Sequence, residues 1–335
     1  MFNDNSLADF PRLNGENNDS PRFKRAIAAT PSGVLYVPGG IYEIAEPLEI
    51  TNLCSLELQA CAILRAVKEM DFILRIDNRL QWDKKLRTPD MPQNYNLFLR
   101  GGQFDGNGLA SCVSICHSHH FTLSDSTMLN GKKAGLSVDD GQRFGYEMIV
   151  TNLYCKTVIP GLAGNVGVDI YGGDSHYTDV VVVDYTIGMR LTEHAWANRL
   201  TRCHVWGGPI PPPAEGELPE MLKDSICFDI HQNGNILRDC YADTGAIGFL
   251  IDSGTQMSGC YYYSNPVFNL DNITCIKHVS GTLSVMECTF TKTAEHVKIY
   301  EGSGENLTWC CCNANCFEKD EIPFESGESK VNKFS

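Results

Sequence analysis

The sequence predicts an all-β fold, a solenoid whose short strands stack in parallel from coil to coil, with a short helix at its N-terminal end. Three observations support this fold class. A phrase of about twenty residues recurs along the chain, a column of cysteines recurs with it, and a helical pattern precedes the first strands. Sequence repeats of this length that lack the apolar spacing of a helix are typical of solenoids, in which each coil contacts only its neighbours.

The N-terminal helix is predicted to begin near Ser20, which is a suitable N-cap. Pro21 fits the first helical position, where its missing N–H is not needed, and Pro31 ends the helix. The apolar side chains at helical spacing are Phe23, Ala26 and Ile27. Because a solenoid has an open apolar core at each end, we expect this apolar face to cover the first coil.

Two short strands are predicted after the helix. Residues 34–37, with the sequence VLYV, form a strand, the Pro-Gly-Gly stretch at 38–40 turns the chain, and residues 41–44 form the next strand. From residue 135 onward the repeated phrase is a small residue, an apolar–polar–apolar strand, a polar turn and a second strand. Its central apolar residues, which we expect to point inward, are Val138, Ile170, Leu191, Ile230 and Ile251.

A second column consists of cysteines, which we expect to form an inward structural ladder. Its members are Cys203, Cys240, Cys260, Cys288 and Cys311. The longest step between them contains the Pro-rich stretch 207–224, which we interpret as an inserted loop. All fifteen cysteines are expected to be reduced, because no export signal is visible and buried thiols act as small hydrophobic groups.

The chain is predicted to be a single domain over residues 1–335. Residues 1–45 would form the N-terminal cap and first coil, residues 46–316 the coils, and residues 317–335 a C-terminal cap or tail. The N-terminal sequence has no basic or apolar leader region, which predicts a cytoplasmic protein, or a secreted one if a leader had been removed.

The net charge of −14 excludes function classes that need a basic surface, such as binding nucleic acid or anionic membranes. No apolar run approaches the length of about 18 residues that a membrane span needs. The charge also disfavours a polyanionic glycan unless a cation such as Ca²⁺ bridges it. A neutral substrate suits this balance better.

Two stretches carry a resemblance to a known group. DFPRLNGENNDSPRFKRAI…GVLYVPGGIYEI is similar to the N-terminal pattern of the pectate-lyase-like superfamily of right-handed parallel β-helix proteins, and GGQFDGNG at 101–108 resembles one of its coils. The resemblance implies a right-handed parallel β-helix and a carbohydrate-active enzyme or related spike protein. Its members differ in activity, so no family residue is transferred here.

Polar residues on either side of the inward column are expected to form an outward grid. The predicted catalytic residues are Asp229, Asp169 and Asp252, and the predicted substrate-binding residues are Arg190, His231, Tyr171, Glu193, His194 and Asp139. A rigid grid of carboxylates, Arg, His and Tyr can bind sugar hydroxyls and supply an acid and a base.

Geometry selects two carboxylate pairs from this grid. Asp169 and Asp229 are expected about 9–10 Å apart and Asp229 and Asp252 about 8 Å apart, from the coil spacing of about 4.8 Å. Glycosidases use carboxyl groups about 5–5.5 Å apart when retaining and 6.5–9.5 Å apart when inverting. Arg190 would keep a neighbouring carboxylate ionised, and His231 can serve as acid or base near neutral pH.

No metal site is predicted. CVSICHSHH at 112–120 holds two cysteines and three histidines, but strand alternation would divide them between two faces and zinc-ligand spacing is lacking. Asp105 is interpreted as a turn residue. No cofactor is expected, except Ca²⁺ if the protein were a lyase.

The function predicted first is cleavage of glycosidic bonds in a neutral glycan by a carboxylate pair, through hydrolysis or an inulin-fructotransferase-like intramolecular transfer. A polysaccharide lyase or epimerase acting on a uronate glycan is the second hypothesis. A non-catalytic glycan-binding or spike-like module is the third. The expected partners are an oligo- or polysaccharide and, as the assembly, a homotrimer, with no nucleic acid or membrane.

Overall fold

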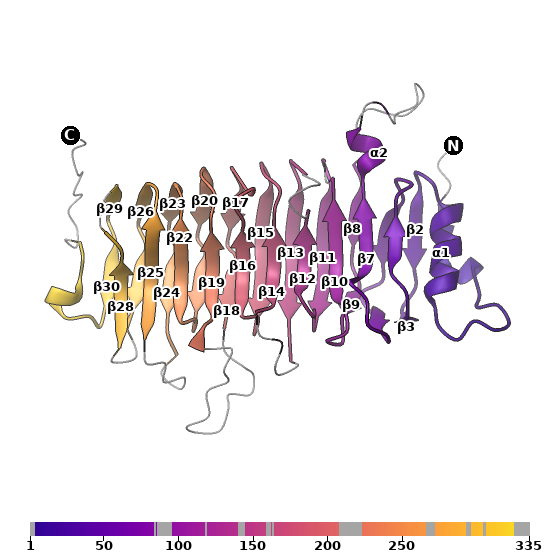
Figure 1. Cartoon of the computed structure of the whole chain (residues 1–335), viewed down its shortest axis with the longest axis horizontal. Helices are drawn as coiled ribbons and strands as arrows, with labels where there is room; N and C mark the ends of the chain where they lie inside the picture. The colour runs from indigo at the N-terminus through magenta and orange to yellow at the C-terminus, as the bar shows by residue number, and fades with distance from the viewer. Residues whose placement is uncertain are drawn as a thin grey trace. The chain divides into compact units, whose positions relative to one another are not determined.

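The computed structural model describes residues 4–83, 85, 96–117, 119–139, 145–158, 162, 164–207, 223–265, 272–292, 296–303 and 306–324. The chain divides into two compact units, which we describe separately. Unit 1 comprises Met1–Leu162 and Val168–Ser175, and unit 2 comprises Ala163–Gly167 and His176–Ser335. In both units, parallel strands recur from coil to coil (Figure 1). The predicted fold class, a parallel β-helix with one N-terminal helix, is confirmed.

Unit 1 contains the helices η1 (Leu7–Asp9), α1 (Ser20–Ala29) and α2 (Arg79–Trp82), and the strands β1 (Asn5–Ser6), β2 (Val34–Val37), β3 (Gly40–Ile44), β4 (Leu48–Ile50), β5 (Ser55–Leu58), β6 (Ala62–Ala66), β7 (Phe72–Asp77), β8 (Phe98–Arg100), β9 (Gln103–Asp105), β10 (Ser111–Cys116), β11 (Thr122–Leu129), β12 (Ala134–Val138) and β13 (Ile149–Lys156). Strand β14 (Val166–Ile170) contributes its last three residues to this unit. Strands β4, β7, β10 and β12 stack in one sheet, and β2, β5, β8, β11 and β13 stack in the other.

Unit 2 contains the strands β15 (His176–Val183), β16 (Ile187–Leu191), β17 (Arg199–Thr201), β18 (His204–Trp206), β19 (Ile226–Ile230), β20 (Asn235–Arg238), β21 (Tyr241–Asp243), β22 (Ile247–Asp252), β23 (Thr255–Ser258), β24 (Tyr261–Tyr263), β25 (Ile273–Ser280), β26 (Leu283–Met286), β27 (Thr289–Thr291), β28 (Val297–Glu301), β29 (Leu307–Cys310) and β30 (Asn313–Asn315), and the short helix η2 (Lys319–Glu321). Strands β16, β19, β22, β25 and β28 form one sheet. The inserted loop was predicted over residues 207–224. Most of it, residues 208–222, lies outside the described residues.

Helix α1 covers the first coil of unit 1, as predicted (Figure 1). Phe23 and Ala26 are fully buried, and Ile27 is 5% exposed. The N-cap is Asp19 rather than Ser20. The Ser20 hydroxyl instead accepts hydrogen bonds from the backbone N–H groups of Ala45 and Glu46, so it fixes the helix to the next strand.

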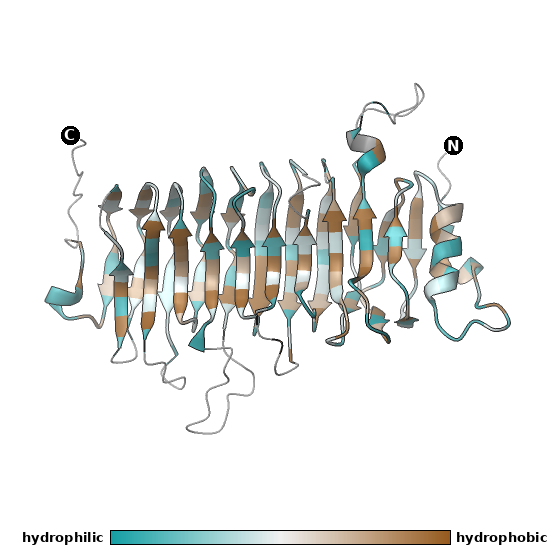
Figure 2. Ribbon diagram, viewed as in Figure 1, coloured by the Kyte–Doolittle hydropathy of each residue, from teal (hydrophilic) through white to brown (hydrophobic). Residues whose placement is uncertain are grey.

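The central apolar column points inward, as predicted. In unit 2, Leu191, Ile230 and Ile251 are fully buried and in register across β16, β19 and β22. In unit 1, Val138 and Ile170 are equally buried. Along β16 and β19 a single polar residue interrupts a run of apolar and small residues, and the ribbons accordingly show mainly brown and white bands broken by teal (Figure 2).

The repeated glycine has a steric cause. A Cβ on Gly188 would lie 2.2 Å from Val205, and one on Gly248 would lie 2.4 Å from the ring of Tyr262 and 2.7 Å from the carbonyl of Cys275. These positions share a column with Cys227 and Cys275, because β16, β19, β22 and β25 pair in register. The column therefore accepts small residues at the places where the opposite sheet approaches most closely.

The cysteine ladder is confirmed for four members and wrong for the fifth. Cys203, Cys240, Cys260 and Cys288 are at most 1% exposed, but Cys311 is exposed and Cys312 takes the inward position. The residues directly before the inward cysteines have left-handed backbone conformations with φ between 52° and 62°: Arg202, Asp239, Gly259, Glu287 and Cys311. Cys311 therefore belongs to the turn, and Cys312 follows it into the core.

Aromatic side chains cover the last coil in the part of unit 2 that the structure describes. Phe324 is 8% exposed and its ring lies 4.9 Å from Trp309, which in turn lies 6.1 Å from Phe290. Residues 317–324 thus cover the last coil, whereas residues 325–335 are outside the described residues. Within the described residues, no helix has the length and apolar character to cross a membrane.

Candidate functional site

The outer face of one sheet in unit 2 carries a polar column. The residues in register across its five strands are Arg190, Asp229, Leu250, Lys277 and Glu301. The first three were predicted to stack in this order, and they do. The residues on either side of the first four are buried, and Glu301 is itself exposed, so strand alternation places this column on the outward face.

Asp229 and Asp252 lie on opposite sides of one imidazole ring. His231 Nε2 is 2.7 Å from Asp229 Oδ1, and His231 Nδ1 is 3.6 Å from Asp252 Oδ2. We call these three residues the Asp–His–Asp group. The imidazole ring therefore occupies the space between the two carboxylates.

The two carboxylates have different surroundings. The Asp229 side chain is 6% exposed, whereas that of Asp252 is 38% exposed and accepts a hydrogen bond of 2.7 Å from the Ser280 hydroxyl. The register between β22 and β25 shifts at Asp252, which pairs with Ser280 two residues beyond the partner of Ile251. This β-bulge brings the Ser280 hydroxyl beside Asp252.

The Asp229 carboxylate changes the charge of His231. Its contact with the imidazole, 2.7 Å from Nε2, raises the pKa of His231, and Asp252 adds to this effect, while partial burial acts in the opposite direction. The ring therefore stays an imidazolium to higher pH than a free histidine. At 3.6 Å, the Nδ1–Asp252 contact is longer than a direct hydrogen bond and is an ion-pair contact.

The remaining predicted residues of unit 2 border this group. Glu193 is exposed and His194 is half-buried, with 3.6 Å between Glu193 Oε1 and His194 Nε2. Gln232, next to His231, donates its side-chain N–H to the backbone carbonyl of Glu193. The turn that carries Glu193 and His194 is thereby tied to the strand end that carries His231.

Three predicted residues belong to unit 1. Asp169 lies in β14 and is 8% exposed, and Tyr171 follows the same strand and is half-buried. Asp139 is fully buried, and its role in substrate binding stays a prediction. Its backbone has φ 63°, and its carboxylate accepts the backbone N–H of His117 at 2.8 Å, which makes it a structural turn residue.

Asp105 is also a turn residue, as predicted. It accepts hydrogen bonds from the backbone of Asn107 and the side chain of Asn130, and it forms an ion pair with Arg65. These contacts use its carboxylate to hold two neighbouring coils of unit 1 together.

Sequence reasoning missed a second carboxylate–imidazole pair, in unit 1. Asp77 Oδ1 lies 2.9 Å from His117 Nδ1, and Asp77 Oδ2 lies 3.0 Å from Arg79. Both side chains are largely buried. The signal was that Asp77 ends β7 and His117 directly follows β10, two strands that pair in register in one sheet.

It also missed an outward aromatic face on unit 2. The rings of His204 and Tyr241 are stacked at 4.5 Å, and those of Tyr241 and Tyr261 lie 5.1 Å apart. Trp206 and Tyr263 occupy the outward position two residues further along, on either side of Asp243. We call His204, Trp206, Tyr241, Tyr261 and Tyr263 the aromatic face. Its sequence signal was the recurring H-V-W, Y-A-D and Y-Y-Y at the same place in the repeat.

A pocket of about 380 Å³ lies in unit 1, lined by Pro47, Glu69, Met70, Asp71, Ser111, Lys132 and Lys133. None of the predicted site residues lines it. Lys132 pairs with Glu69, so charges of opposite sign meet at its wall. It offers no acid–base arrangement comparable to the Asp–His–Asp group.

The parallel sheets, the left-handed turn columns and the outward polar column define a protein of the parallel β-helix class. The resemblance to the pectate-lyase-like superfamily is confirmed at the level of the fold, because solved proteins of this kind superimpose on the chain. No protein-family model and no curated protein matches the sequence.

Three solved structures illustrate the similarity. Endo-xylogalacturonan hydrolase from Aspergillus tubingensis is 13% identical over 93% of each chain, with a TM-score of 0.57. Alginate lyase from Paenibacillus sp. is 11% identical over 86% of this chain and 96% of its own, with a TM-score of 0.57. ORF18 of Geobacillus virus E2 is 12% identical over 93% of this chain, with a TM-score of 0.61, and this chain spans 61% of its length.

Proposed function

We propose that this protein is a carbohydrate-active enzyme that cleaves glycosidic bonds of a neutral glycan, with the Asp–His–Asp group as its catalytic centre. The observation that carries the proposal is the placement of Asp229 and Asp252 on either side of His231 on a rigid outward sheet. The fold is shared with solved proteins named for xylogalacturonan hydrolysis and alginate lysis, which supports a carbohydrate as the substrate but not its neutral character.

The proposed chemistry divides the work between a proton donor and a base. The proton shared by Asp229 and His231 is transferred to the departing glycosidic oxygen. The more exposed carboxylate, Asp252, accepts a proton from the water that attacks the anomeric carbon. Arg190 lies beside Asp229 in register and would bind the substrate or keep the carboxylate ionised.

The net charge of −14 supports a neutral substrate. An acidic surface repels a polyanionic chain, and this repulsion is screened by salt or bridged by a divalent cation. A hydrolase or transferase acting on a neutral glycan would therefore need no Ca²⁺.

The test is an incubation of the protein with neutral and acidic glycans, with and without Ca²⁺, following reducing ends and product mass. Asp229→Asn and Asp252→Asn should each lower the rate on a cleaved neutral glycan by about 10²–10⁴-fold, the usual size of an acid–base contribution. Asp169→Asn, tested in parallel, shows whether the third predicted carboxylate takes part. Asp239→Asn is the matched control, because Asp239 is exposed and its left-handed backbone accepts asparagine.

Three outcomes separate the hypotheses. Full activity of both Asp229→Asn and Asp252→Asn would refute the catalytic assignment. A Ca²⁺-dependent unsaturated product from an acidic glycan would identify a lyase instead. Binding without turnover would identify a non-catalytic module.

Glycan binding without cleavage is the second candidate function, and the aromatic face favours it. Tyrosine and tryptophan side chains present a flat apolar ring and one polar group, which suits the apolar faces and hydroxyls of sugars. Binding through this face predicts that Tyr261→Ala weakens glycan affinity, whereas Asp252→Asn leaves affinity unchanged. The predicted homotrimer and cytoplasmic location stay predictions, which light scattering and cell fractionation would test.

A further inference from the structure

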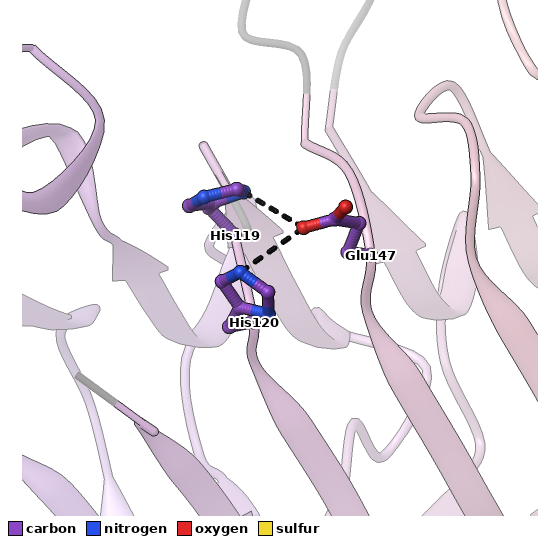
Figure 3. Close-up of side chains that lie close together, drawn as sticks. All are labelled: His119, His120 and Glu147. Carbon is purple, nitrogen blue, oxygen red and sulfur yellow. Dashed lines mark ion pairs between the residues drawn. The ribbon is translucent and has the colours of Figure 1, made fainter. Parts of the chain in front are cut away.

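We infer that unit 1 carries a metal site formed by His119, His120 and Glu147, which takes a borderline divalent ion such as Zn²⁺ and leaves a coordination position open. The three side chains converge on one point, with both imidazoles directed at the same carboxylate oxygen (Figure 3). This site is separate from the Asp–His–Asp group in its residues and in its expected chemistry.

The fold brings these residues together from positions 27 residues apart. The parallel bridge from His119 to Tyr146 aligns two successive coils, and a second bridge aligns Tyr146 with Gly173. His120 and Glu147 follow the bridged residues, and both have left-handed backbone conformations, with φ 53° and 58°. They therefore occupy equivalent turn positions on neighbouring coils.

The sequence prediction of no metal site rested on strand alternation. His119 and His120 lie beyond the end of β10, where alternation no longer holds, so adjacent histidines can face one ligand. Their ring centroids are 4.3 Å apart with a tilt of 55°. The missing distant ligand is Glu147, which only the stacking of coils supplies.

The separations match a metal coordination sphere. Glu147 Oε2 lies 3.1 Å from His120 Nε2 and 3.7 Å from His119 Nδ1, and all three ligand atoms lie within 4.8 Å of one another. Ligands about 2.0–2.1 Å from a tetrahedral zinc ion are about 3.3–3.4 Å apart. The observed contacts bracket that value, so the ion would require small side-chain movements.

Exposure leaves room for an ion and for a fourth ligand. The side chains of His119, His120 and Glu147 are 26%, 42% and 51% exposed. Two imidazoles and one carboxylate with a water in the fourth position form an open zinc site, in contrast to the closed four-ligand sites that only stabilise a fold. Asp174, exposed and in the same left-handed position one coil further on, adds a nearby carboxylate.

The test uses the full chain, stripped of metal with a chelator and titrated with Co²⁺ and Zn²⁺. We expect one ion per chain and a rise in melting temperature on binding, because an ion that binds the folded state stabilises it. The Co²⁺ spectrum should show nitrogen and oxygen ligands without thiolate-to-metal charge transfer. This readout matters because Cys61, Cys311 and Cys316 are exposed thiols that can bind the same ions.

Three variants test the ligands one at a time. His119→Ala, His120→Ala and Glu147→Gln should each weaken Zn²⁺ affinity at least tenfold, and the double histidine variant should abolish 1:1 binding. His194→Ala is the matched control, since His194 is also beside a glutamate but belongs to no three-ligand group among the residues that the structure describes. Cys311→Ser controls for thiol binding, and both controls should bind as the parent does.

The proposal is overturned if 1:1 binding persists in the three ligand variants, if the Co²⁺ spectrum shows thiolate ligands, or if no saturable binding occurs at millimolar metal. Because the three side chains are at the surface, the metal-free variants should melt at the parent temperature. This comparison separates a lost ligand from a damaged fold.

Discussion

At the scale of single residues, three histidines of this protein show how the surrounding side chains determine the protonation and accessibility of an imidazole. His231 lies between two carboxylates and has a raised pKa. His278 is 5% exposed and bonds to the Tyr300 hydroxyl and two backbone carbonyls. His117 contacts the largely buried Asp77. The His231 side chain can contact a ligand from solvent, whereas the His278 side chain is buried and held by its hydrogen bonds.

Asp229→Asn should lower the pKa of His231 toward the ordinary value of about 6.5, because the asparagine amide removes the negative charge 2.7 Å away. NMR titration of the imidazole resonances measures this shift. Asp239→Asn, at an exposed turn, should leave the His231 pKa where it is. An unchanged pKa in Asp229→Asn would contradict the ion pair.

The same ion pair predicts the direction of a pH effect on stability. A histidine whose pKa is raised on folding binds its proton more tightly in the folded state, so its stabilisation is complete below the unfolded-state pKa of about 6.5 and is lost as the pH rises through the folded pKa. Urea denaturation at pH values across this window should therefore show stability falling with pH, and this fall should be smaller in Asp229→Asn.

At the scale of elements, close approach of the two sheets explains the repeated glycine. Gly248→Ala should destabilise the protein by about 1–3 kcal/mol, the usual cost of overpacking. Its Cβ would meet the ring of Tyr262, which is fully buried and held by a hydrogen bond from its hydroxyl to the Gly245 carbonyl. Denaturant unfolding measures the change.

Gly254→Ala is the control for that substitution. Its nearest neighbour would be the tip of the Asn233 side chain at 2.9 Å, not a buried ring or backbone. Moving that tip gives up only its exposed hydrogen bond with the Gly254 N–H, so a smaller loss than at Gly248 is expected. Equal stability losses in both variants would mean that the close approach at Gly248 is not the cause.

The capping helix gives a second prediction at this scale. Phe23→Ala should cost about 3–5 kcal/mol, the range for a fully buried phenylalanine, since the ring is 0% exposed and meets Tyr42 edge to face at 5.3 Å. Thermal or urea unfolding would show the loss. The control is Lys24→Ala, on the exposed face of the same helix, which should change stability by less than about 1 kcal/mol. If Phe23→Ala were as stable as Lys24→Ala, α1 would not cover the apolar core of the first coil.

At the scale of the whole molecule, the cysteines are the simplest test of the fold. All fifteen are free thiols in the structure, and eleven are buried, whereas Cys61, Cys311 and Cys316 are exposed and Cys310 is partly exposed. Burial raises the pKa of Cys54 and of Cys112 to about 12. These two thiols are therefore un-ionised at neutral pH, and burial keeps reagents from the other inward cysteines.

Alkylation of the native, chelator-treated protein should modify the three exposed cysteines and, more slowly, Cys310, and unfolding should release all fifteen. Mass spectrometry counts the adducts. Cys311→Ser should lower the native count by one, and Cys312→Ser should leave it unchanged. Rapid native labelling of Cys312 in place of Cys311 would reverse the assignment of the two residues.

The sequence by itself determined the repeat, the inward apolar column, the capping helix and the outward position of Asp229 and His231. These features follow from periodicity, because strands that recur once per coil must stack and alternate their side chains. Periodicity also placed Asp252 near His231. The error at Cys311, one residue from the true position, arose because a turn residue in the left-handed conformation breaks the alternation.

Only the tertiary structure decided which polar residues are accessible and which turn residues meet. Asp139 occupies the same predicted grid as His231, yet it is fully buried because its carboxylate accepts the His117 backbone N–H. Glu147 lies close to His119 and His120 because the two turns occupy equivalent positions on successive coils. The length and backbone conformation of the turns determine which turn side chains contact each other. The periodic pattern that defines the strands specifies neither property.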